Sequence, residues 1–282
     1  MSGELAKILE YGVGALALGY LGICVLVWLF EPRLVYFPTR AAEGVTPSLR
    51  GLSFDDVEIA TADGETLAAW WVPADDPDAP VVLFLHGNTG AITGRLDTLE
   101  ILHGLGVSTL IVDYRGYGRS SGVPSEAGTY EDAAASWRHL TEIRGIAPGR
   151  IVLFGRSLGG GIAAWLATRV PARALVLEST FTSLPDVGAR VYWWLPVRWI
   201  SRIQYPTRER LGEVNMPVLI IHSADDELVP IGQGRALYDA AREPRRFLPI
   251  KGLHASGFFE SGSTYRRGVA EFFREFVFDH GR

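Results

Sequence analysis

One serine lies where a catalytic nucleophile would be expected. Residues 151–154 form a short apolar run and residues 162–167 form another, which indicates a buried strand followed by a helix. Between them, residues 155–159 have the Gly-x-Ser-x-Gly spacing of a nucleophile elbow, whose small neighbours let the backbone turn sharply. The turn raises the serine hydroxyl above the sheet edge, and the helix start faces any charge that develops on it. We therefore predict that Ser157 is a nucleophile.

A serine hydroxyl needs a base to remove its proton, and the base needs an acid to hold its tautomer. With a nucleophile elbow, these partners follow the serine in the order acid and then histidine. Asp226 follows the apolar run 218–222, and His254 follows the run 247–250. Both positions correspond to the carboxyl ends of strands, where α/β sheets carry their sites. We predict His254 as the base and Asp226 as its acid.

Alternatives to these partners exist in the chain. Asp225 is adjacent to Asp226, and Glu178 ends the strand expected after the elbow, so each is a second candidate for the acid. Asp226 is favoured by the local Asp-x-x-Val-Pro frame, although a solvated acidic turn is the simpler interpretation of that segment. The other histidines are interpreted as surface residues or as residues with satisfied hydrogen bonds, namely His86, His103, His139, His222 and His280.

Acyl transfer also requires N–H donors that stabilise an oxyanion. The backbone N–H of Leu158 lies next to the nucleophile at a helix start. The loop at residues 85–90 supplies a second candidate, the main chain of Asn88, because the glycines near it let the backbone turn toward the site. The side chain of Asn88 should then matter little. The simpler interpretation of this loop is a turn that ends a strand.

The first part of the chain has the composition of a membrane anchor. No charged residue occurs from Tyr11 to Phe30, and a helix of that length rises about 30 Å, the thickness of a hydrocarbon core. A cleaved signal peptide fits less well, because the run is too long and no small-residue cleavage site follows. Cys24 is the single cysteine, so an intrachain disulfide is excluded. We interpret Cys24 as a small buried hydrophobic residue.

We divide the chain into an anchor at residues 1–32, a connector at 33–51 and a catalytic domain at 52–282. Pro32 and Pro38 favour a stiff connector over a continuing helix. Lys7 lies on one side of the anchor, and several arginines lie on the other. The positive-inside tendency therefore favours a cytoplasmic catalytic domain.

Apolar strands alternate with helices through the rest of the chain, which predicts an α/β fold with a mostly parallel sheet and helices on both faces. The first two strands should form a hairpin around Asp63-Gly64. The expected strands are 52–59, 67–72, 81–85, 108–114, 151–154, 174–178, 218–222 and 247–250, and the expected helices are 92–102, 125–143, 162–167, 234–241 and 269–278.

Residues 185–216 interrupt this alternation and are rich in tryptophan, tyrosine and arginine. They could form a short cap whose aromatic side chains line an acyl pocket or touch the bilayer interface. Alternatively, these aromatic residues pack a connecting helix onto the sheet.

A formal net charge of −5 and a pI near 5.7 give no support for nucleic-acid binding. No metal or nucleotide cofactor is implied, since residues 159–161 lack the ending of a phosphate loop.

Taken in order, these segments resemble the α/β-hydrolase superfamily from about Leu52 onward, and more narrowly its membrane-anchored bud-emergence (Bem-type) subgroup, whose relatives include protein depalmitoylases. The resemblance implies a serine-hydrolase mechanism with Ser157, Asp226 and His254 as the triad. It implies a structural role for the glycine-rich turn after Asp113. The matching segments are 34–38, 86–90, 113–120, 155–160, 178–183, 226–230 and 252–254.

These observations predict a membrane-tethered hydrolase that cleaves carboxylic esters or thioesters through an acyl-enzyme on Ser157. The anchor and the aromatic segment favour acylated or lipid-like substrates. Two alternatives remain: a peptidase of the aminopeptidase-like branch, and a catalytically silent scaffold that binds partners. An intact triad argues against the silent scaffold. The sequence leaves acyl-chain length, physiological substrate and oligomeric state open.

Overall fold

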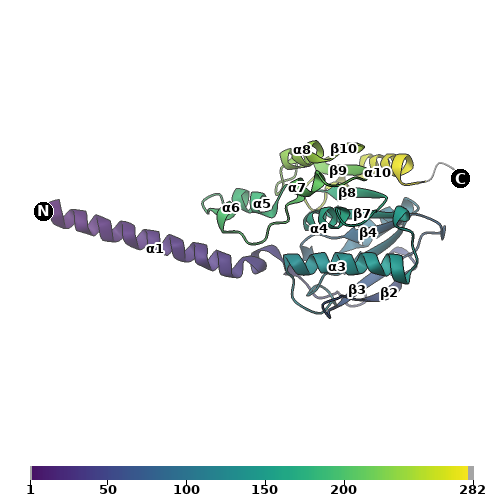
Figure 1. The fold of residues 1–282 in the computed structure, drawn as a ribbon, viewed down its shortest axis with the longest axis horizontal. Coiled ribbons are helices and arrows are strands. Elements are labelled where there is room, and N and C mark those ends of the chain that lie inside the picture. Colours follow the sequence, from purple (N-terminus) through teal and green to yellow (C-terminus); the bar gives the residue numbers. More distant parts are fainter. Residues whose placement is uncertain (1, 279–282) are drawn as a thin grey trace.

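The computed structural model describes residues 2–278, and its core is a mixed β-sheet with helices on both faces (Figure 1). Within these residues the sheet has eight strands in the order β10-β9-β8-β7-β4-β6-β3-β2. The strands are β2 (Asp55–Ala60), β3 (Thr66–Val72), β4 (Val81–Leu85), β6 (Ser108–Val112), β7 (Ile151–Arg156), β8 (Ala174–Glu178), β9 (Val218–Ser223) and β10 (Arg245–Ile250). This arrangement confirms the predicted α/β class.

One strand runs against the others. β3 pairs antiparallel with β2 and with β6, whereas the pairs from β6 through β10 are parallel. The β2–β3 hairpin turns at Asp63 and Gly64, as predicted, and Gly64 has a φ of 93°. Because the parallel strands share a direction, the ends of β7, β9 and β10 meet at one edge, and the predicted site residues follow those ends.

Alternate residues of the central strands face two separate apolar cores. Leu83 and Leu153 point to the face covered by α3 (Glu126–Arg138), α4 (Leu158–Ala167) and α8 (Ile231–Ala240). Phe84 and Phe154 point to the face covered by α2 (Leu96–Gly104) and α10 (Gly262–Phe276). Burial on both faces explains why these strands read as continuous apolar runs.

Two expected helices are divided in the structure, and the closing helix begins earlier than expected. Residues Ile92–Arg95 form a 3-10 turn before α2, and residues His139–Ile143 form a π-helical turn after α3. The closing helix α10 begins at Gly262, seven residues before its predicted start. Exposed polar residues dominate that first part, so the apolar periodicity that predicted the helix begins only later.

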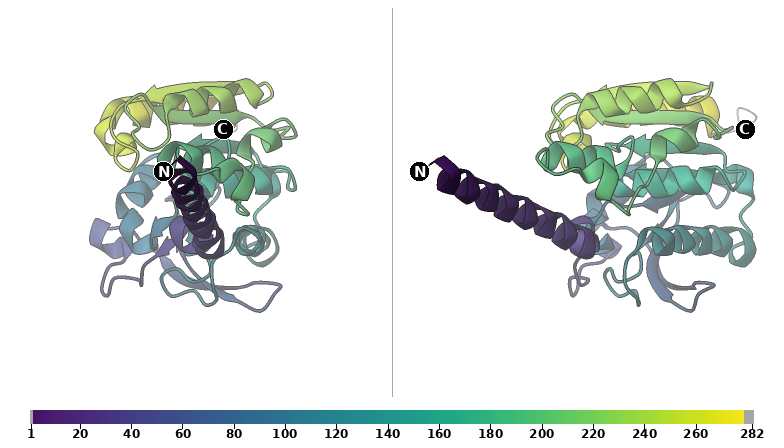
Figure 2. Two further views of the ribbon diagram at one scale, coloured as in Figure 1. Left: turned by 90° about the vertical axis from the view of Figure 1, so that its left-hand side faces the viewer. Right: turned by 60° about the vertical axis from the view of Figure 1, so that its left-hand side comes forward.

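The helix α1 (Ser2–Val35) projects from the domain as a long rod (Figures 1 and 2). Its segment Lys7–Val35 is long and apolar enough to cross a membrane, by length and composition. The helix continues through Pro32, so the prediction that the proline ends it was wrong. Pro32 has no N–H to donate to the carbonyl of Trp28, but the guanidinium of Arg202 donates to that carbonyl at 2.6 Å instead.

The segment between β8 and β9 contains three short helices, α5 (Leu184–Val191), α6 (Val197–Ile200) and α7 (Thr207–Leu211). Trp193 and Trp199 have 81% and 90% of their surface exposed, and Trp194 is exposed as well. They do not pack a helix onto the sheet, which corrects that interpretation for the tryptophans. Tyr205 does pack into the core, where its hydroxyl bonds to Tyr36 and Thr129.

Candidate active site

Ser157 occupies a strained turn between β7 and α4. Its φ of 52° and ψ of −118° lie in a region that residues with a side chain rarely adopt. The conformation is held from both sides, since the N–H of Ser157 donates to the carbonyl of Glu178 at 2.8 Å and its carbonyl accepts from Gly160 and Thr180. Strain of this kind persists only where the surroundings fix it, and it occurs at functional sites.

The glycines of the motif are required by close backbone contacts. A Cβ atom at Gly155 would lie 2.3 Å from the carbonyl oxygen of Gly159. A Cβ atom at Gly159 would lie 2.0 Å from the carbonyl oxygen of Leu85. Both distances are far inside van der Waals contact, so a side chain at either position would force α4 away from the sheet. The Gly-x-Ser-x-Gly spacing therefore follows from how closely the helix start approaches β4 and β7.

His254 joins the serine to an acid across long sequence separations. Its Nε2 lies 3.0 Å from Oγ of Ser157, and its Nδ1 lies 2.8 Å from Oδ2 of Asp226. When Nδ1–H donates to the carboxylate, Nε2 carries the lone pair that can accept the serine proton. The structure thus brings together Ser157, His254 and Asp226 in the order and geometry that a general-base relay requires.

Asp226 is held by backbone donors as well as by the histidine. Its Oδ1 accepts from the N–H groups of Leu228 and Val229 at 3.0 and 2.7 Å, and its side chain is fully buried. Asp225 points elsewhere and accepts from the N–H of Gly252. The turn that follows β9 therefore orients the two neighbouring aspartates differently.

Glu178, the second alternative acid, belongs to a separate buried cluster. Its Oε1 lies 2.6 Å from Nε of Arg156, and its Oε2 accepts from the hydroxyl of Tyr265 at 2.6 Å. The guanidinium of Arg156 also bonds to Thr98. Both carboxylate oxygens of Glu178 are occupied by this cluster, so its partner is Arg156 and not His254.

The loop after β4 approaches the serine. A Cβ atom at Gly87 would lie 3.4 Å from the Cβ of Ser157. The side-chain amide of Asn88 points away and donates to the carbonyl of Val35 at 2.8 Å. Among the described residues the backbone N–H of Asn88 has no hydrogen-bond partner. The backbone N–H of Leu158 is in the first turn of α4, where helices leave N–H groups without an internal partner.

The same loop is attached to the end of α1. The N–H of Phe37 donates to the carbonyl of Asn88 at 3.0 Å, and residues Phe37–Pro38 pair with Thr89–Gly90 as strands β1 and β5. The hydroxyl of Tyr117 donates to the same Asn88 carbonyl at 2.7 Å. The projecting helix therefore ends directly on the segment that carries the predicted oxyanion donor.

His222 and His86 differ from the interpretation that they are surface or satisfied residues. Both rings are buried, and in the described part of the chain Nδ1 of His222 and Nε2 of His86 lack a hydrogen-bond partner. His222 lies behind the site: its Nε2 donates to the carbonyl of Val229 at 2.7 Å and is 3.6 Å from Oδ2 of Asp226. Burial lowers its pKa, so it supports the acid loop as a neutral ring. Its position four residues before Asp226 was the available sequence signal.

His86 forms part of a buried cluster beneath the loop after β4. Its ring lies against Tyr114 at 4.5 Å between ring centroids, and its Nε2 is 3.7 Å from Oδ1 of Asp113. Burial lowers the pKa of His86 to about 3 and raises the pKa of Asp113 to about 7.

His103 and His139 are half-buried on helices, as interpreted, whereas His280 lies outside the described residues.

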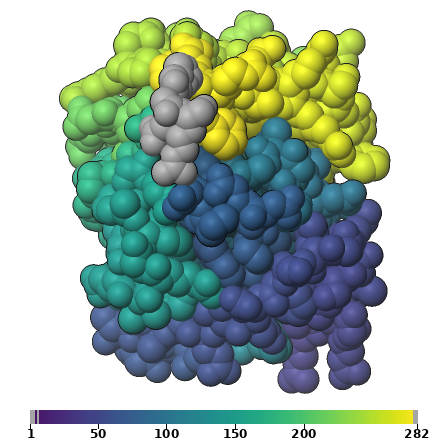
Figure 3. All heavy atoms as spheres, turned by 90° about the vertical axis from the view of Figure 1, so that its right-hand side faces the viewer, coloured from purple at the N-terminus to yellow at the C-terminus, as the bar shows by residue number. Residues whose placement is uncertain are grey.

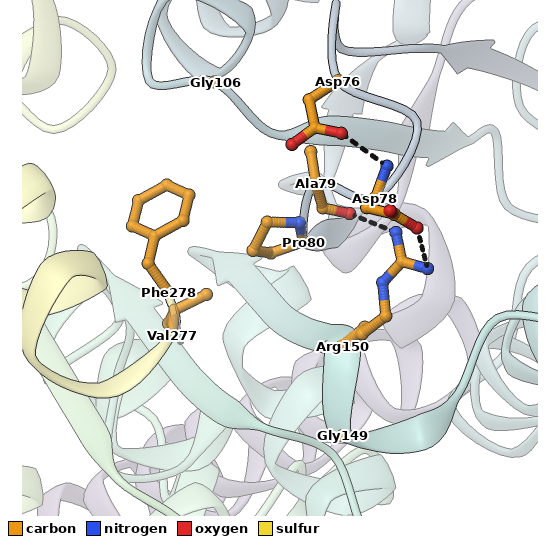
Figure 4. A pocket seen from close by; sticks show the side chains of 9 residues that line it. All are labelled: Asp76, Asp78, Ala79, Pro80, Gly106, Gly149, Arg150, Val277 and Phe278. Carbon is orange, nitrogen blue, oxygen red and sulfur yellow. Dashed lines mark hydrogen bonds and ion pairs between the residues drawn. The ribbon is translucent and has the colours of Figure 1, made fainter. Parts of the chain in front are cut away.

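A cavity of about 450 Å³ lies far from these residues, at the opposite edge of the sheet. It is bounded by the loop before β4, by Arg150 before β7 and by Phe278 after α10 (Figure 4). Figure 3 shows this face, where the blue loop before β4 lies below the yellow C-terminal part of the chain. Arg150 bonds to the carbonyl of Ala79 and pairs with Asp78. Among the described residues, its lining contains no serine, cysteine or histidine, so the cavity offers no counterpart of Ser157 and His254.

Comparisons with known proteins agree with this architecture. A family model described as serine aminopeptidase, S33, matches residues 76–206. An uncharacterized protein of Mycobacterium tuberculosis, Rv2307c, is 40% identical over 86% of each chain. Protein bem46 of Schizosaccharomyces pombe is 30% identical over 82% of this chain and 81% of its own. The lysophosphatidylserine lipase ABHD12 of Danio rerio is 34% identical over 63% of this chain, which spans 51% of that protein.

Solved structures show the same fold. The Pyrococcus furiosus esterase Pf2001 superposes with a TM-score of 0.74 at 23% identity, over 86% of this chain and 100% of that one. Together with bem46, which matches most of both chains, these similarities confirm the resemblance drawn from the sequence motifs. The chain is a hydrolase that belongs to the α/β-hydrolase family, within the Bem-type subgroup.

Proposed function

We propose that this protein is a serine hydrolase that cleaves carboxylic esters or thioesters through an acyl-enzyme on Ser157. The observation that carries the proposal is the continuous hydrogen-bonded relay from Oγ of Ser157 through the ring of His254 to the carboxylate of Asp226. The serine lies at the point of backbone strain, and the acid is shielded from solvent. A serine so placed is activated by its neighbours and not by its own acidity.

The proposed reaction has two acyl-transfer steps. Nε2 of His254 takes the proton of Ser157 as Oγ attacks the carbonyl carbon, and the imidazolium is stabilised by Asp226. The N–H groups of Leu158 and Asn88 donate to the oxyanion. His254 then returns the proton to the departing alcohol or thiol, which leaves an acyl group on Oγ. Water, deprotonated by the same ring, hydrolyses that ester and restores the serine.

Acylated or lipid-like substrates are favoured by the place of the site. The helix α1 ends on the loop that carries Asn88, so an anchor in a bilayer would hold the site next to lipid. Two similar proteins support an ester substrate: one is named a lysophosphatidylserine lipase and the other an esterase. In this proposal α1 is a membrane anchor that remains attached.

The proposed orientation places the catalytic domain in the cytoplasm. The arginines that flank the domain side of α1 outnumber the single lysine on the other side. Protease added to intact spheroplasts should leave the domain uncut and should degrade it after lysis. Cleavage in intact spheroplasts would reverse the orientation without affecting the chemistry.

A peptidase is the second candidate, because the matching family model is described as a serine aminopeptidase. Both activities use the same relay, and they differ in the leaving group that the site accepts. Rates on p-nitrophenyl esters of increasing chain length, compared with rates on aminoacyl p-nitroanilides, separate them. Faster cleavage of the esters is expected, and faster cleavage of the anilides would replace the esterase proposal with the peptidase.

The alternative of a silent scaffold is tested by covalent labelling. A fluorophosphonate probe reacts with activated serines, so we expect it to label the full-length protein in membranes and to leave the Ser157→Ala variant unlabelled. Ser223→Ala is a suitable control, because Ser223 is the last residue of β9, at the same edge of the sheet, and its hydroxyl bonds to the carbonyl of Gly252. Failure to label the wild-type protein would favour the scaffold.

A further inference from the structure

The α5–α6 hairpin, residues 184–200, exposes large apolar side chains that the proposed chemistry does not use. Trp193 and Trp199 are almost fully exposed, and Trp194 and Val191 are exposed as well. The turn between the two helices satisfies part of its own backbone, since the N–H of Leu195 donates to the carbonyl of Tyr192. Exposed apolar clusters of this kind mark surfaces that contact a partner.

The hairpin lies alongside α1. The hydroxyl of Tyr20 donates to the carbonyl of Trp194 at 2.9 Å, and the carboxylate of Glu31 accepts from the N–H of Arg202 just beyond the hairpin. Cys24, between those two positions, is buried although its neighbours along α1 are exposed. Tyr20, Cys24 and Glu31 share one helical face, so the contact extends for three turns, about 16 Å along the axis. Figure 1 shows α5 and α6 on the side of the domain from which α1 leaves.

This contact places the hairpin beside the apolar part of α1. Tyr20 lies within the segment Lys7–Val35 that is suited to cross a membrane. In a bilayer the carbonyl of Trp194 and the hydroxyl of Tyr20 would each need a hydrogen-bond partner, because hydrocarbon offers none. The two groups satisfy one another. Arg202, at the root of the hairpin, donates to Trp28 and stacks on its ring at 4.2 Å, where a cation would meet lipid headgroups.

We infer that the α5–α6 hairpin inserts into the same leaflet that α1 enters, as a second membrane-embedded element. The inference rests on the proposed role of α1 as an anchor. Trp193, at the tip, is adjacent to Trp194, whose carbonyl bonds to Tyr20, so in this arrangement it reaches the acyl chains. Trp199 lies two residues before Ser201, whose hydroxyl bonds to Glu31, so it stays near the headgroups. The catalytic domain is therefore held at the membrane surface by two elements, which fixes its tilt.

The test measures depth with spin-labelled lipids. The full-length protein in a Cys24→Ser background receives single cysteines by Trp193→Cys, Trp199→Cys, Leu18→Cys or Ile143→Cys. Each is labelled with bimane and reconstituted into phosphatidylcholine–phosphatidylglycerol vesicles that carry a doxyl group on acyl carbon 5 or 12. Leu18 is exposed on α1 and reports whether the anchor is inserted, and Ile143 is exposed on the π-helical turn before β7. Circular dichroism confirms the fold of each variant.

We expect lipid quenching at positions 193 and 199 to exceed that at 143 by about threefold or more, as for side chains inserted in the acyl region. The doxyl group on carbon 12 should quench position 193 more than position 199. If position 18 is quenched and positions 193 and 199 behave like 143, the hairpin inference fails while the anchor stands. If position 18 is unquenched, the anchor proposal fails first. Protection of 193 and 199 from iodide without lipid quenching would point to a protein partner and would overturn the inference.

Discussion

His254 and His86 each lie next to a buried aspartate, but their second ring nitrogens differ. In the first pair, Nδ1 of His254 is 2.8 Å from Asp226, Nε2 is 3.0 Å from Ser157, and 13% of the side chain is exposed. In the second pair, Nε2 of His86 is 3.7 Å from Asp113, and Nδ1 is 2.6 Å from the carbonyl of Gly87. The ring of His86 has no exposed surface.

The difference shows that a histidine–aspartate pair becomes a proton relay through its surroundings. Nε2 of His254 faces a hydroxyl that can give up a proton. Nδ1 of His86 faces a carbonyl oxygen, which has no proton to give and can only accept a hydrogen bond. Burial then lowers the pKa of His86 to about 3, which keeps the ring neutral at physiological pH. These surroundings support the proposal that the first pair acts in catalysis, and we propose that the second supports the loop that carries Asn88.

Removal of the base should have the largest effect. His254→Gln deletes the acceptor for the proton of Ser157, and kcat for a p-nitrophenyl ester should fall by about 10⁶-fold, as when a triad histidine is removed. His103→Gln, on α2 and outside the relay, is the matched control and should retain the wild-type kcat. A His254→Gln enzyme within tenfold of the wild type would assign the base to another residue.

Loss of the acid should be the next largest effect. Asp226→Asn keeps the shape but favours the wrong tautomer of His254, so kcat should fall by about 10⁴-fold. Asp225→Asn changes a carboxylate that bonds to Gly252 instead, and its kcat should change by less than about threefold. Steady-state kinetics on both variants decide between the neighbouring aspartates, and equal losses would contradict the assignment.

Glu178→Ala should destabilise the fold more than it slows the reaction. The substitution leaves the buried guanidinium of Arg156 without its carboxylate, at a cost of about 3–5 kcal/mol in the free energy of unfolding. Glu275→Ala breaks an exposed pair with Arg246 and should cost less than about 1 kcal/mol. Chemical denaturation measures both. A loss of kcat in Glu178→Ala as great as in Asp226→Asn would return Glu178 to the site.

The second pair can be tested by its pH dependence. Burial raises the pKa of Asp113 from its ordinary value of 3.8 to about 7. Between pH 3.8 and about 7, this carboxyl is therefore protonated in the folded state and ionised in the unfolded state. Stability contributed by this group is therefore lost as pH rises from about 4 to 7. Asp113→Asn keeps the acceptor for the N–H of Ile92 and removes that loss. The free energy of unfolding of the Asp113→Asn protein, relative to that of the wild type, should rise over this pH range by at most ~4 kcal/mol and stay constant at higher pH.

A denaturation series from pH 4 to 9 gives this comparison. His86 titrates in both proteins and largely cancels in the difference between them. A stability difference that is the same at every pH would mean that Asp113 is already ionised at pH 4, against the direction of the pKa shift.

Asn88→Ala should have the smallest effect. The side-chain amide bonds to Val35 and points away from Ser157, whereas the proposed donor is the backbone N–H that alanine retains. We expect kcat to fall by about tenfold or less, below the 10²–10³-fold loss seen when an oxyanion donor is removed. A larger loss with an unchanged Tm would indicate that the side chain donates to the oxyanion.

The sequence predicted the features that depend on local pattern. The strands Val81–Leu85 and Ala174–Glu178 match their apolar runs residue for residue, because burial on both faces requires continuous hydrophobicity. The sharp turn at Ser157 was indicated by the glycines on either side, whose backbone contacts leave no room for a side chain. The proximity of Ser157, Asp226 and His254 followed from strand ends that share one edge of the sheet.

Features that depend on distant contacts could not be predicted. The helix continues past Pro32 because Arg202 bonds to the free carbonyl of Trp28, and no local pattern links those residues. The tryptophans of the α5–α6 hairpin are as apolar as core residues, so their exposure becomes evident only when the hairpin is placed beside α1. His222 was set aside as a lone histidine, since its distance to Asp226 depends on the turn after β9.

The central claim is that the acyl group is transferred to Ser157. Rapid mixing of the full-length protein with p-nitrophenyl butyrate, followed by acid quenching and peptide mass mapping, measures this directly. We predict a burst of p-nitrophenol that approaches one equivalent and a butyryl group on the peptide that contains Ser157, both absent in Ser157→Ala. Steady hydrolysis with Ser157 unmodified, or a Ser157→Ala variant that turns over at the wild-type rate, would contradict the account.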